Sequence, residues 1–312
     1  MPAGSQCSNR ILRVVSKAGI GILFSVAQSV GLERKYFKLK MFLQRSFRMP
    51  FLTVNGCTHH YRLTVPETAG EDAPVVAFAN SLGTDFRIWD GVIDRLPQTV
   101  RTLCYDMRGH GLTALSDGLV SIEGLADDFI ALLDALDIST VHMVGLSVGG
   151  MVAQSVAAKA PKRIANLVLC DTAHKIGSPD VWNPRIAAVQ KDGLSSIAEA
   201  VLLRWFDPGF KAANPEIYDG AWAMLTRIPA QGYTDLCAAI RDADLTESTA
   251  QIEAKTLCLC GSADLATPPE LVNAMADLMP NARYEVIDQA GHLPCLEKPD
   301  VVAQKITDFL EI

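Results

Sequence analysis

The stretch TVHMVGLSVGG, residues 140–150, decides how the rest of the chain is organised. Its apolar beginning at 141–144 is typical of a buried strand, and a helical pattern follows at 151–159. Between them, Gly145 to Gly149 fits the pattern Gly-x-Ser-x-Gly, which forms a nucleophile elbow when it joins a strand to a helix. Ser147 would then stand beyond the strand, at the positive end of the helix. A plain turn of small residues would give the same pentapeptide, so other parts of the chain must decide between the two interpretations.

The composition indicates a globular protein with a sizeable core. The 312 residues are 49% hydrophobic and 20% charged, which fits one domain with an insertion or two small domains. The net charge of −7 argues against nucleic acid as the main partner. The eight cysteines lie mostly in apolar runs, and Cys258 and Cys260 have no second ligand pair at zinc spacing. We therefore predict no metal and no cofactor, and a reducing cytoplasm is the simplest location.

Residues 1–48 differ from the remainder of the chain. They hold nine Lys or Arg residues but a single acidic residue, Glu33. The uncharged run at 18–32 is shorter than the roughly 20 residues of a membrane-spanning helix, so no stable membrane span is expected. This basic extension is either a wrongly assigned start, with the natural chain beginning near Met49, or a targeting or membrane-surface segment. We exclude it from the predicted fold.

Residues 49–312 show strands that alternate with helices. A hairpin signal, Asn55-Gly56, separates the first two β-rich runs. The predicted strands lie at 51–54, 58–65, 75–79, 100–105, 141–144, 164–170, 256–260 and 283–287, and the predicted helices at 86–96, 122–136, 151–159, 269–279 and 301–310. Strands and helices cease to alternate at about 172–250, which reads as a helical cap insertion. The pattern predicts an α/β fold with a mostly parallel, eight-stranded sheet covered by helices.

Three candidate catalytic residues each follow a predicted strand directly. They are Ser147, Asp264 and His292, and ligands of an open α/β sheet bind beyond the carboxyl ends of its strands. Singly, Asp264 could be a solvated turn residue and His292 an ordinary loop histidine. Together they have the order of a hydrolase triad on this kind of sheet. His292 would take the proton of Ser147, and Asp264 would orient the imidazole and stabilise its cation.

Two backbone N–H groups are candidates for the oxyanion hole. Val148 follows the nucleophile, and Leu82 lies in the loop after the third strand. In the turn DMRGHG, residues 106–111, we expect Asp106 and Arg108 to form a local ion pair and His110 to be scaffold rather than a base.

Residues 49–312 resemble the α/β-hydrolases, and more narrowly the 3-oxoadipate enol-lactonases of aromatic catabolism in the β-ketoadipate pathway. The motifs that carry the resemblance are NSLGT at 80–84, YDMRGHG at 105–111, GLSVGG at 145–150, AHKIG at 173–177, VWNxR at 181–185 and RWF at 204–206. Most relatives have His-Gly where this chain has Asn80-Ser81. The resemblance implies that Trp182 and Arg185 bind a small lactone substrate that bears a carboxylate. It also implies ring opening through an acyl-Ser147 intermediate, which is then hydrolysed to 3-oxoadipate.

Two other functions fit the same sequence. One is hydrolysis of another carboxylic ester, a thioester or a carbon–carbon bond on the same scaffold, and the other is a non-catalytic ligand receptor. The basic extension departs from the family pattern and puts the location in doubt. No fused decarboxylase domain is expected after Ile312, and the sequence does not reveal an oligomeric state.

Overall fold

The computed structural model describes residues 50–70, 72–115 and 117–312. The expectations for residues 1–48 lie outside this part of the chain. Within it, no helix is both long enough and apolar enough to cross a membrane.

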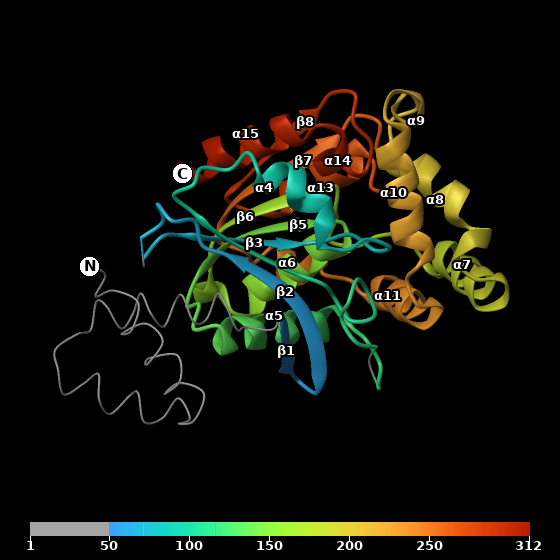
Figure 1. Ribbon diagram of the computed structural model, residues 1–312, viewed down its shortest axis with the longest axis horizontal. Helices are drawn as coiled ribbons and strands as arrows, with labels where there is room; N and C mark the ends of the chain where they lie inside the picture. The colour runs from blue at the N-terminus through green and yellow to red at the C-terminus, as the bar shows by residue number, and fades with distance from the viewer. Residues whose placement is uncertain (1–49, 71, 116) are drawn as a thin grey trace, which may run out of the picture. The chain divides into compact units, whose positions relative to one another are not determined.

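An eight-stranded sheet forms the centre of residues 50–312, and it confirms the predicted architecture (Figure 1). The strands lie in the order β1-β2-β4-β3-β5-β6-β7-β8. β2 runs antiparallel to β1 and β4, and the pairs from β4 through β8 are parallel. The strands are β1 (Phe51–Val54), β2 (Cys57–Thr64), β3 (Val75–Ala79), β4 (Arg101–Tyr105), β5 (Val141–Leu146), β6 (Ile164–Cys170), β7 (Lys255–Gly261) and β8 (Ala282–Ile287).

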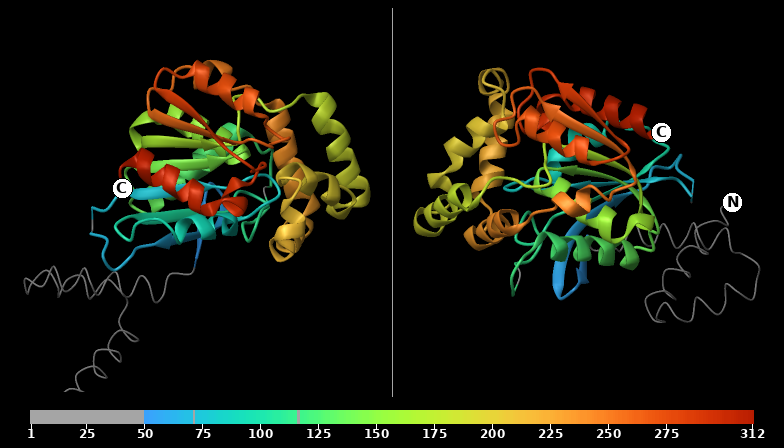
Figure 2. Two further views of the ribbon diagram at one scale, coloured as in Figure 1. Left: turned by 90° about the horizontal axis from the view of Figure 1, so that it is seen from above. Right: turned by 180° about the vertical axis from the view of Figure 1, so that it is seen from behind.

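The central strands are apolar because helices cover both of their faces. All five residues of β3, VVAFA, are buried, as expected for a strand with no solvent-exposed side. The connection from β3 to β4 and the connection from β4 to β5 run in opposite directions along the sheet. Because crossovers between parallel strands are right-handed, the helix of the first connection, α4, lies on one face of the sheet and the helix of the second, α5, lies on the other. α15 packs on α4, and α6 packs on α5 (Figures 1 and 2). The helices of these layers are α4 (Asp90–Ile93), α5 (Ile122–Ala135), α6 (Val148–Lys159), α13 (Pro269–Leu278) and α15 (Pro299–Leu310), with the one-turn α14 (Pro294–Glu297) before α15.

One predicted helix is much shorter than expected. The pattern at 86–96 predicted a single helix, but the structure has a 3-10 turn, η1 (Phe86–Trp89), followed by the one-turn α4. Gly91 weakens helix propagation here, and Pro97 lies close behind.

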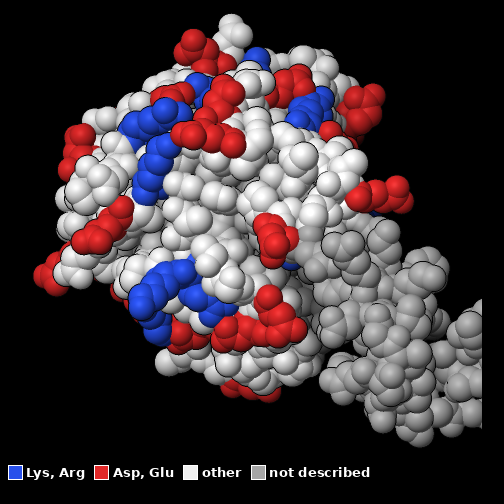
Figure 3. Space-filling model, turned by 90° about the vertical axis from the view of Figure 1, so that its left-hand side faces the viewer, with Lys and Arg blue, Asp and Glu red and all other residues white. Residues whose placement is uncertain are grey.

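Between β6 and β7 the chain forms helices and no strand. One of them, α12 (Thr246–Thr249), packs on α6 and α13 of the core. The others lie to the right of the sheet in Figure 1, beyond the carboxyl ends of the parallel strands. They are α7 (Pro179–Asp192), α8 (Ala198–Trp205), α9 (Phe210–Ala213), α10 (Pro215–Thr226) and α11 (Ala230–Asp242). We call them the cap helices. Away from them, the face in Figure 3 carries acidic and basic side chains side by side.

Candidate active site

Ser147 occupies a strained turn between β5 and α6. Its φ of 57° and ψ of −120° are unusual for a residue with a side chain. The turn is possible because the two flanking glycines have no Cβ. A Cβ on Gly145 would lie 2.4 Å from the Gly149 oxygen, and one on Gly149 would lie 2.4 Å from the Ala79 oxygen. The sequence thus fixes both the strain and the position of the hydroxyl, at the end of the sheet.

Asp264 follows β7 and is held by four donors. Its Oδ1 accepts from the backbone N–H groups of Ala266 and Thr267, at 2.7 and 3.1 Å. Its Oδ2 accepts from the Thr267 hydroxyl at 2.6 Å and from His292 Nδ1 at 2.9 Å. Burial by itself raises the pKa of this carboxyl, but His292 and the other donors outweigh it and leave the pKa below its usual range. Asp264 is therefore a buried carboxylate.

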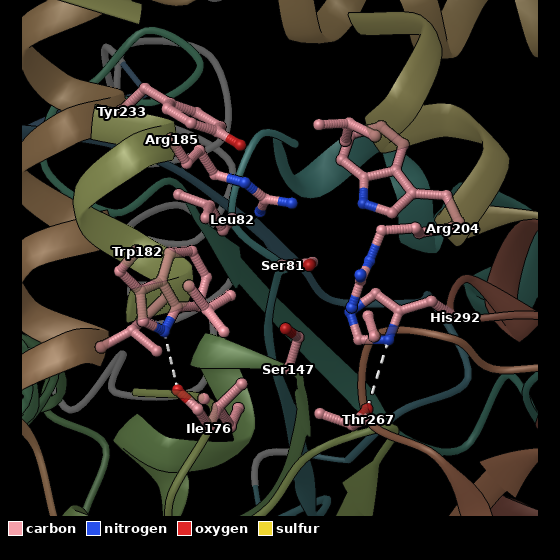
Figure 4. Close-up of a pocket in the computed structure, with 16 residues that line it drawn as sticks. Ser81, Leu82, Ser147, Ile176, Trp182, Arg185, Arg204, Tyr233, Thr267 and His292 are labelled. Atoms are coloured by element: carbon pink, nitrogen blue, oxygen red, sulfur yellow. Dashed lines mark hydrogen bonds between the residues drawn. The ribbon is translucent and has the colours of Figure 1, made fainter. Parts of the chain in front are cut away.

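His292 follows β8 and lies in the same cavity as Ser147 (Figure 4). Its side chain is only 3% exposed. Because Nδ1 donates to the Asp264 carboxylate, Nε2 of the neutral ring is left as a proton acceptor. The structure therefore brings the three candidate catalytic residues to one end of the sheet, from the ends of β5, β7 and β8.

A second buried carboxyl group, Asp171, was missed in the sequence. It follows β6, as Asp264 follows β7, and this shared position was the signal that could have found it. Its Oδ1 accepts from Gly261 N at 2.8 Å, whereas its Oδ2 is buried and, among the described residues, has no partner. Burial, and next the Asp264 charge, raise the pKa of Asp171 well above its usual range. Since Asp264 has four donors and Asp171 has one, Asp171 is the carboxyl group that holds a proton.

The two carboxyl groups also lie close to the Cys260 thiol, with one ligand atom of each residue within 4.8 Å of the others. This donor set is poorly suited to a metal ion. The Asp264 oxygens already accept four hydrogen bonds, and burial raises the pKa of the Cys260 thiol, which keeps it protonated.

The candidate oxyanion donors lie on two adjacent segments. Leu82 lines the cavity, and Val148 is the first residue of α6, where helix N–H groups have no internal acceptor. Among the described residues, neither N–H donates to another backbone group. The Leu82 loop is anchored by the next residue, because Gly83 N–H donates to His110 Nε2 at 3.1 Å. Burial lowers the pKa of His110 to about 4, so His110 stays a neutral acceptor that supports the loop.

The expected ion pair between Asp106 and Arg108 is wrong. Asp106 Oδ2 instead contacts His60 Nδ1 at 2.7 Å, and Arg108 Nη2 donates to Asp128 at 2.8 Å. Tyr61 of β2 lies opposite Tyr105 of β4, and this register brings His60 next to the end of β4. The partners come from segments far away in the sequence, which the local pattern could not reveal.

The cavity in front of Ser147 has a volume of about 190 Å³. The cap helices supply its outer wall, including Trp182 and Arg185 of α7. Trp182 Nε1 donates to Ile176 O at 2.7 Å, and the Arg185 guanidinium lies 5.1 Å from the centre of the Trp182 ring. A second arginine in the wall, Arg204 of α8, was not singled out from the sequence as a site residue. The lining is completed by Ser81, Ile176, Gly177, Val181, Val201, Trp205, Tyr233, Ile240, Ala266 and Thr267.

The fold and this site define a class of protein. The chain matches the model of the alpha/beta hydrolase family over residues 76–305, and it belongs to that family. Hydrolase activity is the general activity that the family and the relatives support.

Among known proteins, the chain is 33% identical over 249 residues to 3-oxoadipate enol-lactonase 1 of Acinetobacter baylyi, covering 80% of this chain and 93% of that protein. Among solved structures, it is similar to the enol-lactonase from Burkholderia xenovorans LB400, with a TM-score of 0.81, 34% identity and coverage of 84% and 100%. It is also similar to a malate-bound thermophilic esterase from Thermogutta terrifontis, with a TM-score of 0.77, 28% identity and coverage of 85% and 97%.

Proposed function

We propose that the protein is a serine hydrolase that opens 3-oxoadipate enol-lactone to 3-oxoadipate. The observation that carries the proposal is one small cavity that joins Ser147 and the Asp264–His292 pair to Arg185. The two relatives named as enol-lactonases support the choice of lactone.

The catalytic steps follow from the hydrogen bonds of the site. His292 Nε2 takes the Ser147 proton as the hydroxyl attacks the lactone carbonyl, and Asp264 stabilises the imidazolium through Nδ1. The Leu82 and Val148 N–H groups donate to the oxyanion of the tetrahedral intermediate. The ring C–O bond then breaks, and His292 returns its proton to the enolate oxygen. Water attacks the acyl-Ser147 ester with His292 as base, which releases the enol form of the product and restores the serine; the enol then becomes the ketone 3-oxoadipate when its proton moves from oxygen to carbon.

Recognition is assigned to the cap helices. The lactone carries a free carboxylate, and Arg185 can bind it with two parallel hydrogen bonds. The hydrogen bond from Trp182 to Ile176 fixes the indole, whose face covers the substrate and supports the Arg185 guanidinium. The core would thus supply the chemistry, and the cap would supply the choice of substrate.

The test uses the full-length protein and two substrates. Loss of the lactone is followed by ultraviolet absorbance, with an uncharged aryl ester as the comparison. Ser147→Ala should abolish both reactions. Arg185→Met should raise KM for the lactone about tenfold to a hundredfold, because a charge-assisted pair is lost, and should leave aryl ester turnover nearly unchanged. The matched control is Arg283→Met, which removes a half-exposed arginine outside the cavity.

The outcomes separate the candidate functions. Aryl ester turnover without lactone turnover would retain the serine hydrolase and reject the lactonase assignment. Turnover of neither substrate, with no labelling of Ser147 by a serine-directed probe, would reject catalysis and favour a ligand receptor.

A further inference from the structure

Two arginines face the cavity from different helices. Arg185 comes from α7 and Arg204 from α8, and Figure 4 shows both side chains reaching into the space in front of Ser147. Neither side chain lies within salt-bridge distance of an acidic group in the described residues, whereas Arg62, Arg87 and Arg163, for example, each do. The described residues that line the cavity therefore include two arginines and no Asp or Glu.

Arg204 is placed on the catalytic side of the cavity. Its Nη2 donates to Leu265 O at 2.6 Å, which ties α8 to the loop that carries Asp264. In Figure 4 the guanidinium lies next to His292, while Arg185 lies on the side of Tyr233. One hydrogen bond uses one of five N–H donors, so most of the donors on this guanidinium remain available to a ligand.

Placing the two arginine side chains close together is electrostatically unfavourable in the absence of an anion. Burial, and next the neighbouring Arg185 charge, lower the pKa of Arg204, and the Asp264 carboxylate offsets only part of this effect. Two half-buried like charges are unfavourable unless an anion lies between them, and such unpaired charge is typical of binding sites.

We propose that Arg204 is a second carboxylate-binding residue, and that the cavity is built for ligands with two anionic ends. This inference rests on the proposed hydrolase function. Arg185 binds the carboxylate that the lactone already carries, and Arg204 binds the carboxylate that hydrolysis creates at the carbon released from Ser147.

The charges of the reaction agree with this division. The lactone carries one negative charge. When water adds to the acyl-Ser147 carbon and the bond to Ser147 Oγ breaks, the serine regains its proton through His292. The new carboxylic acid then loses a proton, so the product carries two charges. Each tetrahedral intermediate also carries two negative charges, one on its distal carboxylate and one on the oxyanion. A second cation near the reacting end therefore stabilises the intermediate more than the bound lactone, which carries one charge.

The experiment measures discrimination between two unreactive ligands of equal chain length. Adipate has two carboxylates and hexanoate has one, and each is tested as a competitive inhibitor of aryl ester hydrolysis by the full-length protein. We expect the wild type to bind adipate about tenfold to a hundredfold more tightly than hexanoate. Arg204→Met and Arg185→Met should each reduce this ratio to near one, because one cation remains. Arg204→Lys should recover part of it.

The other outcomes would overturn the proposal. The proposal is refuted if Arg204→Met keeps the wild-type ratio of adipate affinity to hexanoate affinity. It is also refuted if the wild type does not prefer adipate. If Arg204→Met lowers aryl ester turnover and thermal stability and weakens both inhibitors equally, Arg204 only tethers α8 to Leu265. Failure of the lactone assignment is distinguished by its own assay. Adipate selectivity that depends on Arg204, without lactone turnover, would reject that substrate and retain the two-cation site.

Discussion

Replacing Asp264 with Asn tests which of the two buried carboxyl groups orients His292. The structure determines how the new amide would lie. Its oxygen must face the backbone N–H groups of Ala266 and Thr267, because both donate to Oδ1. The NH₂ group would then occupy the position of Oδ2 and donate to His292 Nδ1. The imidazole would be held with its proton on Nε2, where it cannot accept the proton of Ser147.

The size of the effect follows from this tautomer. An equivalent change of a catalytic aspartate lowers kcat about 10⁴-fold, and at 1.36 kcal/mol for each factor of ten this is about 5.5 kcal/mol of activation free energy. Asp264→Asn also keeps the shape of the side chain, so the melting temperature should change far less than the rate.

Asp171→Asn is the matched control, since it makes the same change in the other buried carboxyl group. Because Asp171 already holds a proton, an amide replaces a neutral group, and kcat should change by less than about threefold. The assay is aryl ester hydrolysis at neutral pH, with thermal melting of both variants. A loss of less than tenfold in Asp264→Asn, or a larger loss in Asp171→Asn, would refute the assignment of Asp264 as the orienting group.

Two further predictions concern the loops around the site. Burial raises the pKa of Glu297 from 4.5 to about 7. Between these two pH values the folded protein retains a proton that the unfolded chain releases, so the free energy of unfolding falls as the pH rises from 4.5 to 7. The glutamine of Glu297→Gln does not titrate. The melting temperature of this variant minus that of the wild type should therefore increase from pH 4.5 to pH 7, and a difference that stays constant would contradict the prediction. Gly83 has a φ of 85°, and a Cβ there would lie 2.9 Å from Leu225 Cδ1 and 3.0 Å from Trp205 Cζ2. Gly83→Ala should displace the Leu82 donor and lower kcat by up to about 10²–10³-fold, measured with both substrates, and an unchanged kcat would argue against Leu82 in the oxyanion hole.

The parts of the fold that the sequence predicts are those governed by local pattern. The apolar runs of the central strands end where polar side chains begin, so the strands and the residues after them could be placed without coordinates. The single helix predicted at 86–96 does not form, and the reason is also local. Gly91 disfavours helix formation and outweighs the favourable apolar pattern around it.

Partners across the sheet could not be predicted in the same way. Asp106 meets His60 because β2 lies beside β4, and that strand order depends on the whole fold. Arg204 enters the cavity only when α8 packs on α10 beyond the strand ends. Arg204 is one of 28 Lys and Arg residues, and although RWF at 204–206 is among the motifs that carry the family resemblance, that motif does not reveal that the side chain enters the cavity.

The neutral state of Asp171 connects the chemistry of the core to recognition by the cap. With a net charge of −7 the whole chain repels anions, so an anionic substrate requires a local positive field. In the proposed function the two arginines would provide that field, and the Asp264 carboxylate, which accepts four hydrogen bonds, would oppose it with one charge. If Asp171 were ionised, its charge would have only the Gly261 N–H as a donor and would add to that of Asp264, which would weaken the positive field at the reacting end. In the proposed function, the burial that holds the proton on Asp171 would therefore preserve the attraction for an anionic substrate and would leave the Asp264 carboxylate to orient His292.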